Sequence, residues 1–305
     1  MGAIASDGIQ PMHSAPAHAG RHAGRSSRID AVFFALILGC AVIASLVIVL
    51  IAVFLFKESF PLIHKIGAAR FFFDEGWWPD AQQYNLVPMI AASLLLTASA
   101  SLIATPAAIA FAVFTAFYAG PRGRKLLRIL VDVSASVPTS IYAFWGLLTV
   151  VPFVARFAGP GTSLMAGSLV LALMIFPTIT VLTHSAITAV PAHYLTAGAA
   201  LGVKRSALIR HVVLPSARGG IVAAAILGAA RAIGETMVVL VLCGNIVQVP
   251  ASVFDPVRAL TANIALEMPY AMGDHRAALY VSGMIVLLVV TGLVLVSELY
   301  AKRKA

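Results

Sequence analysis

The sequence predicts an all-α integral membrane protein with about six transmembrane helices. Of its 305 residues, 60% are hydrophobic and only 11% are charged, and the mean hydropathy is +0.96. A water-soluble domain is nearer half apolar and a quarter charged, so this composition excludes a soluble globule and a disordered chain. The apolar residues also gather into long runs, and most of the basic residues lie between those runs.

Six apolar runs are long enough to cross a bilayer, which takes about 20 helical residues. They are residues 29–56, 86–118, 126–154, 163–187, 219–242 and 277–300. Pro106, Pro138 and Pro177 lie inside the second, third and fourth runs and predict kinks there. A membrane bundle tolerates such kinks because neighbouring helices can satisfy the freed carbonyl groups.

The first run follows a tail, residues 1–28, that is rich in Gly, Ala, Ser and His and is predicted to be disordered. The apolar run continues for another 16 residues past Cys40. That length exceeds a signal-peptide core, so we expect an uncleaved first span. Residues 29–305 are then one transmembrane domain, with an outer loop at residues 57–85 whose aromatic side chains suit a membrane interface.

The positions of the basic residues predict the orientation of the chain. Of the 21 lysines and arginines, 14 lie in the two tails and in the second and fourth connections, whereas 6 lie in the other connections. Loops rich in lysine and arginine stay in the cytoplasm, so we expect both termini to lie there. The chain is then predicted to be a multi-pass protein of the cell inner membrane. The formal net charge of +9 is explained by these loops, and we expect no nucleic-acid partner.

Arg231 and Glu235 are ionisable residues inside the fifth run, followed by Thr236. Charge inside hydrocarbon is costly, so such residues mark functional sites by default. A spacing of four residues puts both charges on one helix face, where they can pair. In one interpretation the pair only holds the helix against a neighbour, and in the other it faces a polar path for an anion. Gly228 and Gly234 predict close packing of this helix.

The fourth connection, residues 188–218, is long and basic. It contains a helix-favouring stretch that Gly202 interrupts, and it closes at Leu214 and Pro215. One interpretation is a basic helix that lies on anionic lipid headgroups. The other is a short helix that docks into a groove on a cytoplasmic partner.

Motifs for other chemistry are absent from the sequence. No phosphate-cradling G-x-x-x-x-G-K-[ST] loop and no zinc or nucleophile motif occurs, and the two cysteines predict neither a disulfide framework nor a metal site. We therefore expect no enzyme activity, no cofactor and no metal in this chain. Energy from ATP would have to come from another subunit.

Two stretches resemble the permease subunits of ABC importers. Residues 195–202 (LTAGAALG), with the closing VVLP of residues 212–215, are similar to the EAA loop of these permeases. Residues 231–237 (RAIGETM) resemble the signature of the PstC-type permease of phosphate importers. Thr196 occupies the position where the EAA pattern has a glutamate, which weakens the expectation of a charged contact there.

This resemblance implies a type I ABC-importer permease fold and an ATP-driven importer of inorganic phosphate. It also implies a PstA-type second permease, a dimeric cytoplasmic ATPase and a phosphate-binding protein as partners. Arg231, Glu235 and Thr236 become the expected pathway residues. The expected ATPase coupling residues are Thr196, Ala197, Gly198, Leu201, Gly202, Leu214 and Pro215.

Other functions remain open from the sequence. The cargo could be another oxyanion, or the subunit could sense phosphate with little transport. A secondary carrier that works without an ATPase belongs to a different class and would predict internal inverted repeats, which are not evident.

Overall fold

The computed structural model describes residues 23–302, and the side chains of residues 30–300. The chain divides into two compact units, Met1–Val53 and Phe54–Ala305. The described part of the first unit is the beginning of helix α1 (Ala23–Ile66). This helix begins inside the predicted tail, of which residues 1–22 lie outside the described residues. It also continues past Lys57 and Glu58, because charged residues are good helix formers even where they end an apolar run.

The described part of the chain contains five or six candidate spans, where six were predicted. Five helical stretches are long and apolar enough to cross a membrane, and a sixth is a bent pair of helices. The five are Asp30–Ile66, Val87–Tyr118, Leu164–Thr188, Arg205–Ile233 and Gly273–Tyr300. They contain α1, α3 (Val87–Val113) with its π-turn η2 (Phe114–Tyr118), α7 (Leu164–Thr188), α10 (Leu214–Ile233) and α13 (Gly273–Lys302).

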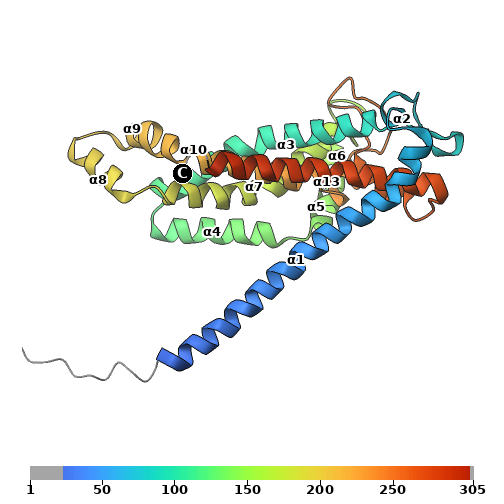
Figure 1. Cartoon of the computed structure of the whole chain (residues 1–305). Coiled ribbons are helices and arrows are strands. Elements are labelled where there is room, and N and C mark those ends of the chain that lie inside the picture. Colours follow the sequence, from blue (N-terminus) through green and yellow to red (C-terminus); the bar gives the residue numbers. More distant parts are fainter. Residues whose placement is uncertain (1–22, 303–305) are drawn as a thin grey trace, which may run out of the picture. The chain divides into compact units, whose positions relative to one another are not determined.

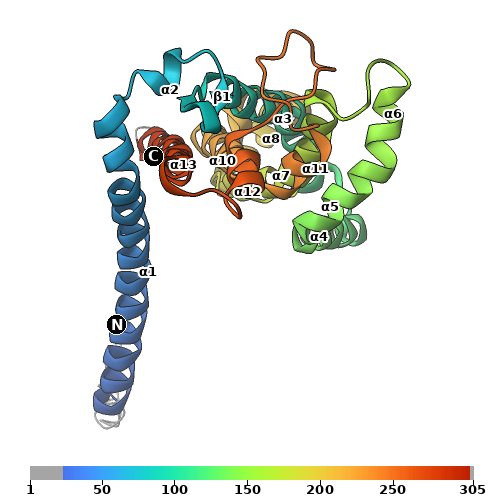
Figure 2. The same cartoon turned by 90° about the vertical axis from the view of Figure 1, so that its right-hand side faces the viewer.

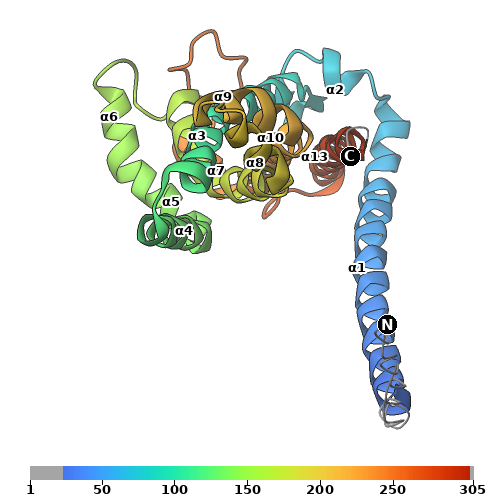
Figure 3. The ribbon, with the colours of Figure 1, turned by 90° about the vertical axis from the view of Figure 1, so that its left-hand side faces the viewer.

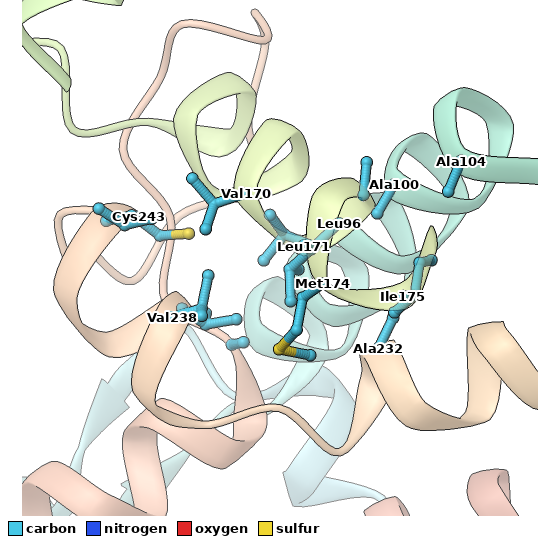
Figure 4. Packing of buried hydrophobic residues seen from close by; sticks show 14 of the residues in the cluster. Leu96, Ala100, Ala104, Val170, Leu171, Met174, Ile175, Ala232, Val238 and Cys243 are labelled. Atoms are coloured by element: carbon cyan, nitrogen blue, oxygen red, sulfur yellow. The ribbon is translucent and has the colours of Figure 1, made fainter. Parts of the chain in front are cut away.

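Helices α3, α7, α10 and α13 pack side by side as the centre of the second unit (Figure 1). The face of α3 that packs on α7 carries a small or apolar residue at every fourth position, which keeps one side of the helix buried. This stripe is Ala92, Leu96, Ala100, Ala104, Ala108 and Ala112. Larger side chains of α7, among them Leu171, Met174 and Ile175, belong to the same buried cluster as these alanines (Figure 4). Small residues let two helix backbones approach closely, which is the main source of packing energy where lipid surrounds a bundle.

Glycines let α10 approach α7 in the same way. A Cβ atom at Gly228 would lie 2.5 Å from Cγ1 of Ile179, and one at Gly220 would lie 2.5 Å from Cβ of Ala186. The packing predicted for Gly228 is therefore confirmed. Gly234 is exposed and ends α10, so the same prediction is wrong for Gly234.

The third span is broken rather than kinked. Helix α4 (Pro121–Ser136) meets α5 (Thr139–Trp145), the π-turn η3 (Gly146–Val150) and α6 (Val151–Ala155) at an angle of 92°. The hydroxyl of Tyr142 donates a hydrogen bond to the carbonyl of Ser134 at 2.8 Å. Tyr142 thereby caps a carbonyl that the break frees, whereas the Ser134 and Ser136 hydroxyls bond to carbonyls inside α4.

The fifth span lies earlier in the chain than predicted. It is continuous from α9 (Arg205–Leu208) through the π-turn η4 (Ile209–Val213) to the end of α10 at Ile233. The expected final turns form a separate helix, α11 (Met237–Leu242). Hydropathy alone could not detect this break, because residues 237–242 are as apolar as the helix before them.

One end of the second unit is built from short elements that lie together in Figure 2. They are α2 (Arg70–Phe73), β1 (Trp77–Trp78), η1 (Pro79–Ala81), β2 (Gln83–Tyr84) and α12 (Leu260–Glu267). The two strands form an antiparallel hairpin in which Trp77 pairs with Tyr84. Asp74 accepts hydrogen bonds from Nε of Arg70 at 3.0 Å and from the backbone N–H of Tyr84 at 2.9 Å. We refer to residues 70–84 as the outer hairpin.

Candidate translocation surface and coupling loop

Arg231 lies in the last turn of α10 with an exposed side chain. A cation at this position is favoured by the partial negative charge at the carboxyl end of a helix. Within the described part of the chain, no salt bridge reaches its guanidinium group, although its charge acts on the nearby hydroxyl of Tyr142.

The predicted pairing of Arg231 with Glu235 is wrong. Helix α10 ends at Ile233, so the two residues do not share a helix face. Oε1 of Glu235 instead accepts a hydrogen bond from the backbone N–H of Met237 at 3.1 Å, and lies 3.5 Å from that of Val238. A carboxylate is stabilised at a helix amino end by the orphan N–H groups there.

Glu235 and Thr236 define the break between α10 and α11. Thr236 is the residue that precedes α11, and its carbonyl accepts the N–H of Leu240 at 2.9 Å. The carbonyl of Glu235 accepts the hydroxyl of Thr261 at 2.8 Å, which ties the break to α12. The Glu235 carboxylate is therefore occupied by backbone groups, and Arg231 has no carboxylate partner among the described residues.

The predicted coupling loop contains helix α8 (Ala192–Ala200), which lies with α9 at one end of the bundle (Figure 3). After α8, the N–H of Val203 bonds to the carbonyl of Gly198 at 3.1 Å, and that of Gly202 to the carbonyl of Ala199 at 3.0 Å. This pair of bonds is the Schellman motif, in which the residue after the cap is left-handed. Gly202 has φ +70°, which explains why a glycine stands there.

The remaining predicted coupling residues fall on both sides of this turn. Gly198 is buried, and a Cβ atom there would collide with the Leu208 side chain of α9, so the glycine allows α8 to fold back on α9. The Thr196 hydroxyl donates to the carbonyl of His193 at 3.1 Å. Leu201 is 82% exposed at the tip. The structure places these residues as follows: Thr196, Ala197 and Gly198 in α8, Leu201 and Gly202 in its cap, and Leu214 and Pro215 in the first turn of α10.

Sequence reasoning missed a polar network at the opposite end of the bundle. Glu267, only 8% exposed, accepts hydrogen bonds from Nε1 of Trp77 at 2.8 Å and from Nη1 of Arg258 at 2.7 Å, and pairs with Nε2 of His275 at 2.9 Å. These residues come from β1, from the segment before α12 and from α13. A buried acid at the end of the short apolar stretch 260–268 was the available signal, but its partners are distant in sequence.

A cleft of about 1070 Å³ opens beside this network. Its lining includes Trp78, Asp80 and Tyr270. Burial, together with the nearby Glu267 carboxylate, raises the pKa of the Tyr270 hydroxyl above its usual value.

Burial opposes ionisation of Asp74 in the outer hairpin, but the hydrogen bonds from Arg70 and Tyr84 outweigh it and lower the pKa of Asp74.

Five apolar helices and a bent pair of helices, with a helical loop at one end of the bundle, are the architecture of a multi-pass membrane protein. The model of the family "Binding-protein-dependent transport system inner membrane component" matches residues 104–304. The chain belongs to this family of ABC-transporter permeases.

Relatives and solved structures agree with this assignment. The chain is 35% identical to the probable ABC transporter permease protein YqgH of Bacillus subtilis over 239 residues, 76% of this chain and 77% of that one. It is 29% identical over 297 residues to the phosphate transport system permease protein PstC of Mesorhizobium japonicum, with 90% of each chain covered.

The fold is that of type I ABC importers. A permease chain of the MetNI methionine ABC transporter superimposes with a TM-score of 0.60 at 18% identity, covering 72% of this chain and 96% of that one. A chain of a bacterial alginate ABC transporter, solved with its periplasmic protein, gives 0.59 at 15% identity, covering 92% and 96%. The protein is thus a multi-pass inner membrane subunit of an ABC importer, a family that works with a second permease, an ATPase and a substrate-binding protein.

Proposed function

We propose that this chain is the phosphate permease subunit of an ATP-driven importer, PstC-type in its role. The observation that carries the proposal is the similarity to proteins named PstC along nearly the whole chain. In this proposal a PstA-type permease completes the path, a dimeric cytoplasmic ATPase engages the loop 188–218, and a phosphate-binding protein delivers the anion. Both termini lie in the cytoplasm, and residues 29–305 form the permease domain.

The pathway residues in this proposal are Arg231, Glu235 and Thr236. Arg231 faces the anion directly, because its guanidinium group has no carboxylate partner among the described residues. Glu235 and Thr236 shape the break that presents it. A single cation attracts a dianion only weakly, which suits a path that must release its cargo, so high affinity belongs to the binding protein.

The coupling residues in this proposal are those of α8 and its cap. The exposed Leu201 and Tyr194 side chains give the tip of this loop an apolar surface. Such a surface fits a helix that docks into a groove of a partner. The absence of a charged residue at Thr196 makes shape and apolar contact the basis of that docking.

The test is radiolabelled phosphate uptake in cells that lack their own phosphate permease, with and without the ATPase partner, and with sulfate as competitor. Uptake that requires the ATPase and resists sulfate supports the proposal. Uptake without the ATPase would identify a carrier instead. A permease for another oxyanion is the second candidate, because the relative YqgH is named as an ABC transporter permease without a substrate and so leaves the cargo open. Inhibition of uptake by sulfate or molybdate would favour that candidate.

Replacement of Arg231 tests the pathway within the same assay. We expect Arg231→Gln to lower phosphate uptake at least about tenfold, since it removes the charge that meets the anion, and Arg231→Lys to retain part of it. Arg276→Gln, at an exposed arginine elsewhere, is the matched control. Normal uptake by Arg231→Gln, at normal membrane abundance, would overturn the assignment of Arg231.

Replacement of Glu235 should lower phosphate uptake by an amount that depends on whether the new side chain can accept a hydrogen bond. The amide oxygen of Glu235→Gln can still accept the N–H of Met237, so we expect a smaller loss of uptake than in Glu235→Ala.

A further inference from the structure

A second pocket lies among α3, η2, α4 and α7. It has a volume of about 320 Å³. Eight polar residues and four apolar residues line it. The polar residues are Thr115, Arg124, Arg128, Asp132, Thr180, His184, Ser185 and Thr188. We refer to this cavity as the α4–α7 pocket.

Two arginines give the pocket a positive wall. Arg124 and Arg128 are four residues apart and so lie on one face of α4. Nε of Arg124 donates to the carbonyl of Thr115, and its Nη2 to that of Ala116, both at 3.2 Å. These bonds hold the guanidinium group at the pocket and leave three of its five donors for an occupant. Arg128 has no salt-bridge partner among the described residues.

The opposite wall, on α7, contributes polar groups. His184 lines the pocket, and its Nδ1 is a buried polar atom without a hydrogen-bond partner in the described part of the chain. Ser185 lines it one residue further on. A buried nitrogen that lacks a partner destabilises the protein until something meets its hydrogen-bonding requirement. The polar groups of α7 thus lie across the pocket from the arginines of α4.

The carboxylate of Asp132 restricts which anions the pocket can bind. It lines the pocket one turn after Arg128, and no salt bridge joins the two in the described structure. A carboxylate beside an anion is repulsive unless the anion carries a proton that the carboxylate can accept in a hydrogen bond. Inorganic phosphate keeps at least one O–H group at neutral pH, because its third proton is lost only in strongly basic solution. A phosphate monoester keeps an O–H in part of its molecules, because its second pKa is about 6. Sulfate has no such proton.

We propose that the α4–α7 pocket binds a phosphate group that retains a proton, at a site separate from Arg231. Arg124 and Arg128 bind the charged oxygens, and Asp132 accepts the O–H. The phosphate group comes either from free inorganic phosphate or from the phosphomonoester headgroup of a lipid. The inference rests on the proposed function only in placing the pocket on the cytoplasmic side.

The test measures binding rather than transport. The full chain, assembled with its partner permease and ATPase, is placed in nanodiscs of zwitterionic lipid and equilibrated with radiolabelled inorganic phosphate. An Arg231→Gln background removes the pathway site. We expect saturable phosphate binding, with an affinity that is at least tenfold lower in Arg128→Gln. Arg122→Gln, an exposed arginine of α4 outside the pocket, is the matched control and should bind as before.

Selectivity tests the role of Asp132. Wild-type protein should bind phosphate at least tenfold more tightly than sulfate, and Asp132→Asn should bring the two affinities close together. In a second arm, the nanodiscs contain phosphatidic acid, whose phosphomonoester headgroup can carry the O–H that a phosphodiester headgroup lacks, and native mass spectrometry counts retained anionic lipid. Lipid that is retained by the wild type and lost in Arg128→Gln, without binding of free phosphate, would identify the headgroup as the source.

Two results would overturn the proposal. One is the absence of any change in phosphate or anionic-lipid binding in Arg128→Gln. The other is an equal loss in Arg122→Gln, which would mean that only the general charge of α4 matters. Uptake assayed in parallel separates this proposal from the proposed function, because pocket binding without phosphate uptake contradicts only the latter, and uptake without pocket binding contradicts only the former.

Discussion

Glu267 connects three segments at the end of the second unit that carries the outer hairpin. Its two carboxylate oxygens meet Trp77, Arg258 and His275, and Arg258 also donates to the carbonyl of Asn245 at 2.9 Å and to Oδ1 of Asn263 at 3.2 Å. A buried carboxylate is stable only when several donors replace the lost water. Removing one member therefore leaves the others unsatisfied.

Glu267→Gln should destabilise the outer end by about 3 kcal/mol, because the half-buried Arg258 loses its counter-charge. Hydrogen–deuterium exchange of the outer hairpin and the melting temperature of the purified protein measure this effect. Glu75→Gln is the control, since Glu75 lines the same cleft but is exposed. Equal exchange in both variants would show that the network does not hold the hairpin.

Asp74 makes the outer hairpin sensitive to acid. Its pKa in the folded protein is lowered, so its carboxylate stabilises the hairpin at pH values above the ordinary aspartate pKa. That stabilisation is lost as the pH falls through the lowered folded pKa, below about 3.9. We expect hairpin exchange to rise in this acid range for the wild type. Asp74→Asn should exchange faster at neutral pH and respond less to acid, and a variant with the same acid response as the wild type would contradict this assignment.

At the scale of elements, α8 and its cap show how local sequence and packing cooperate. The interruption predicted at Gly202 is confirmed, and the reason is the left-handed backbone of the Schellman motif. Gly198 gave no comparable signal in the sequence, because its role depends on Leu208, ten residues away. Turn chemistry can therefore be predicted from a few neighbours, whereas close approach cannot.

Gly202→Ala should weaken the coupling loop, since a left-handed residue with a Cβ costs about 1 kcal/mol. We expect lower ATP-dependent uptake with normal membrane abundance, and Gly202→Asn should recover part of it because asparagine tolerates this conformation. Gly123→Ala, in α4 where a Cβ meets open space, is the control. Full uptake by Gly202→Ala would mean that the shape of this turn does not matter for coupling.

The second unit, Phe54–Ala305, has two ends of different character. The end with α8 and α9 carries basic connections, and the other end carries the outer hairpin, the cleft and the Glu267 network (Figures 2 and 3). The positive-inside rule assigns the first end to the cytoplasm. This assignment is a prediction that labelling can test.

Single cysteines at Leu201 and Met272, which are 82% and 83% exposed, should lie on opposite sides of the membrane. In a Cys40→Ser background, with Cys243 fully buried, a membrane-impermeant maleimide should label position 272 in intact cells. It should label position 201 only in inside-out vesicles. Labelling of both positions from one side would contradict the six-span topology.

The membrane class, the number of spans and the position of the main loop could all be predicted from the sequence. Those properties depend on the length of apolar runs, on prolines and on loop charge, all of which are local or additive along the chain. The RAIGETM and EAA-like stretches also indicated the permease family, because each of these motifs is short and contiguous.

How the charged residues are used depends instead on tertiary contacts. Arg231 and Glu235 are separated because the helix end at Ile233 is set by the packing of α10 and α11 against their neighbours. The third span bends by 92°, and Trp77, Arg258 and His275 meet at Glu267. Such contacts join residues as much as 190 positions apart. A hydropathy pattern depends only on neighbouring residues, so it cannot predict which distant side chains will be in contact.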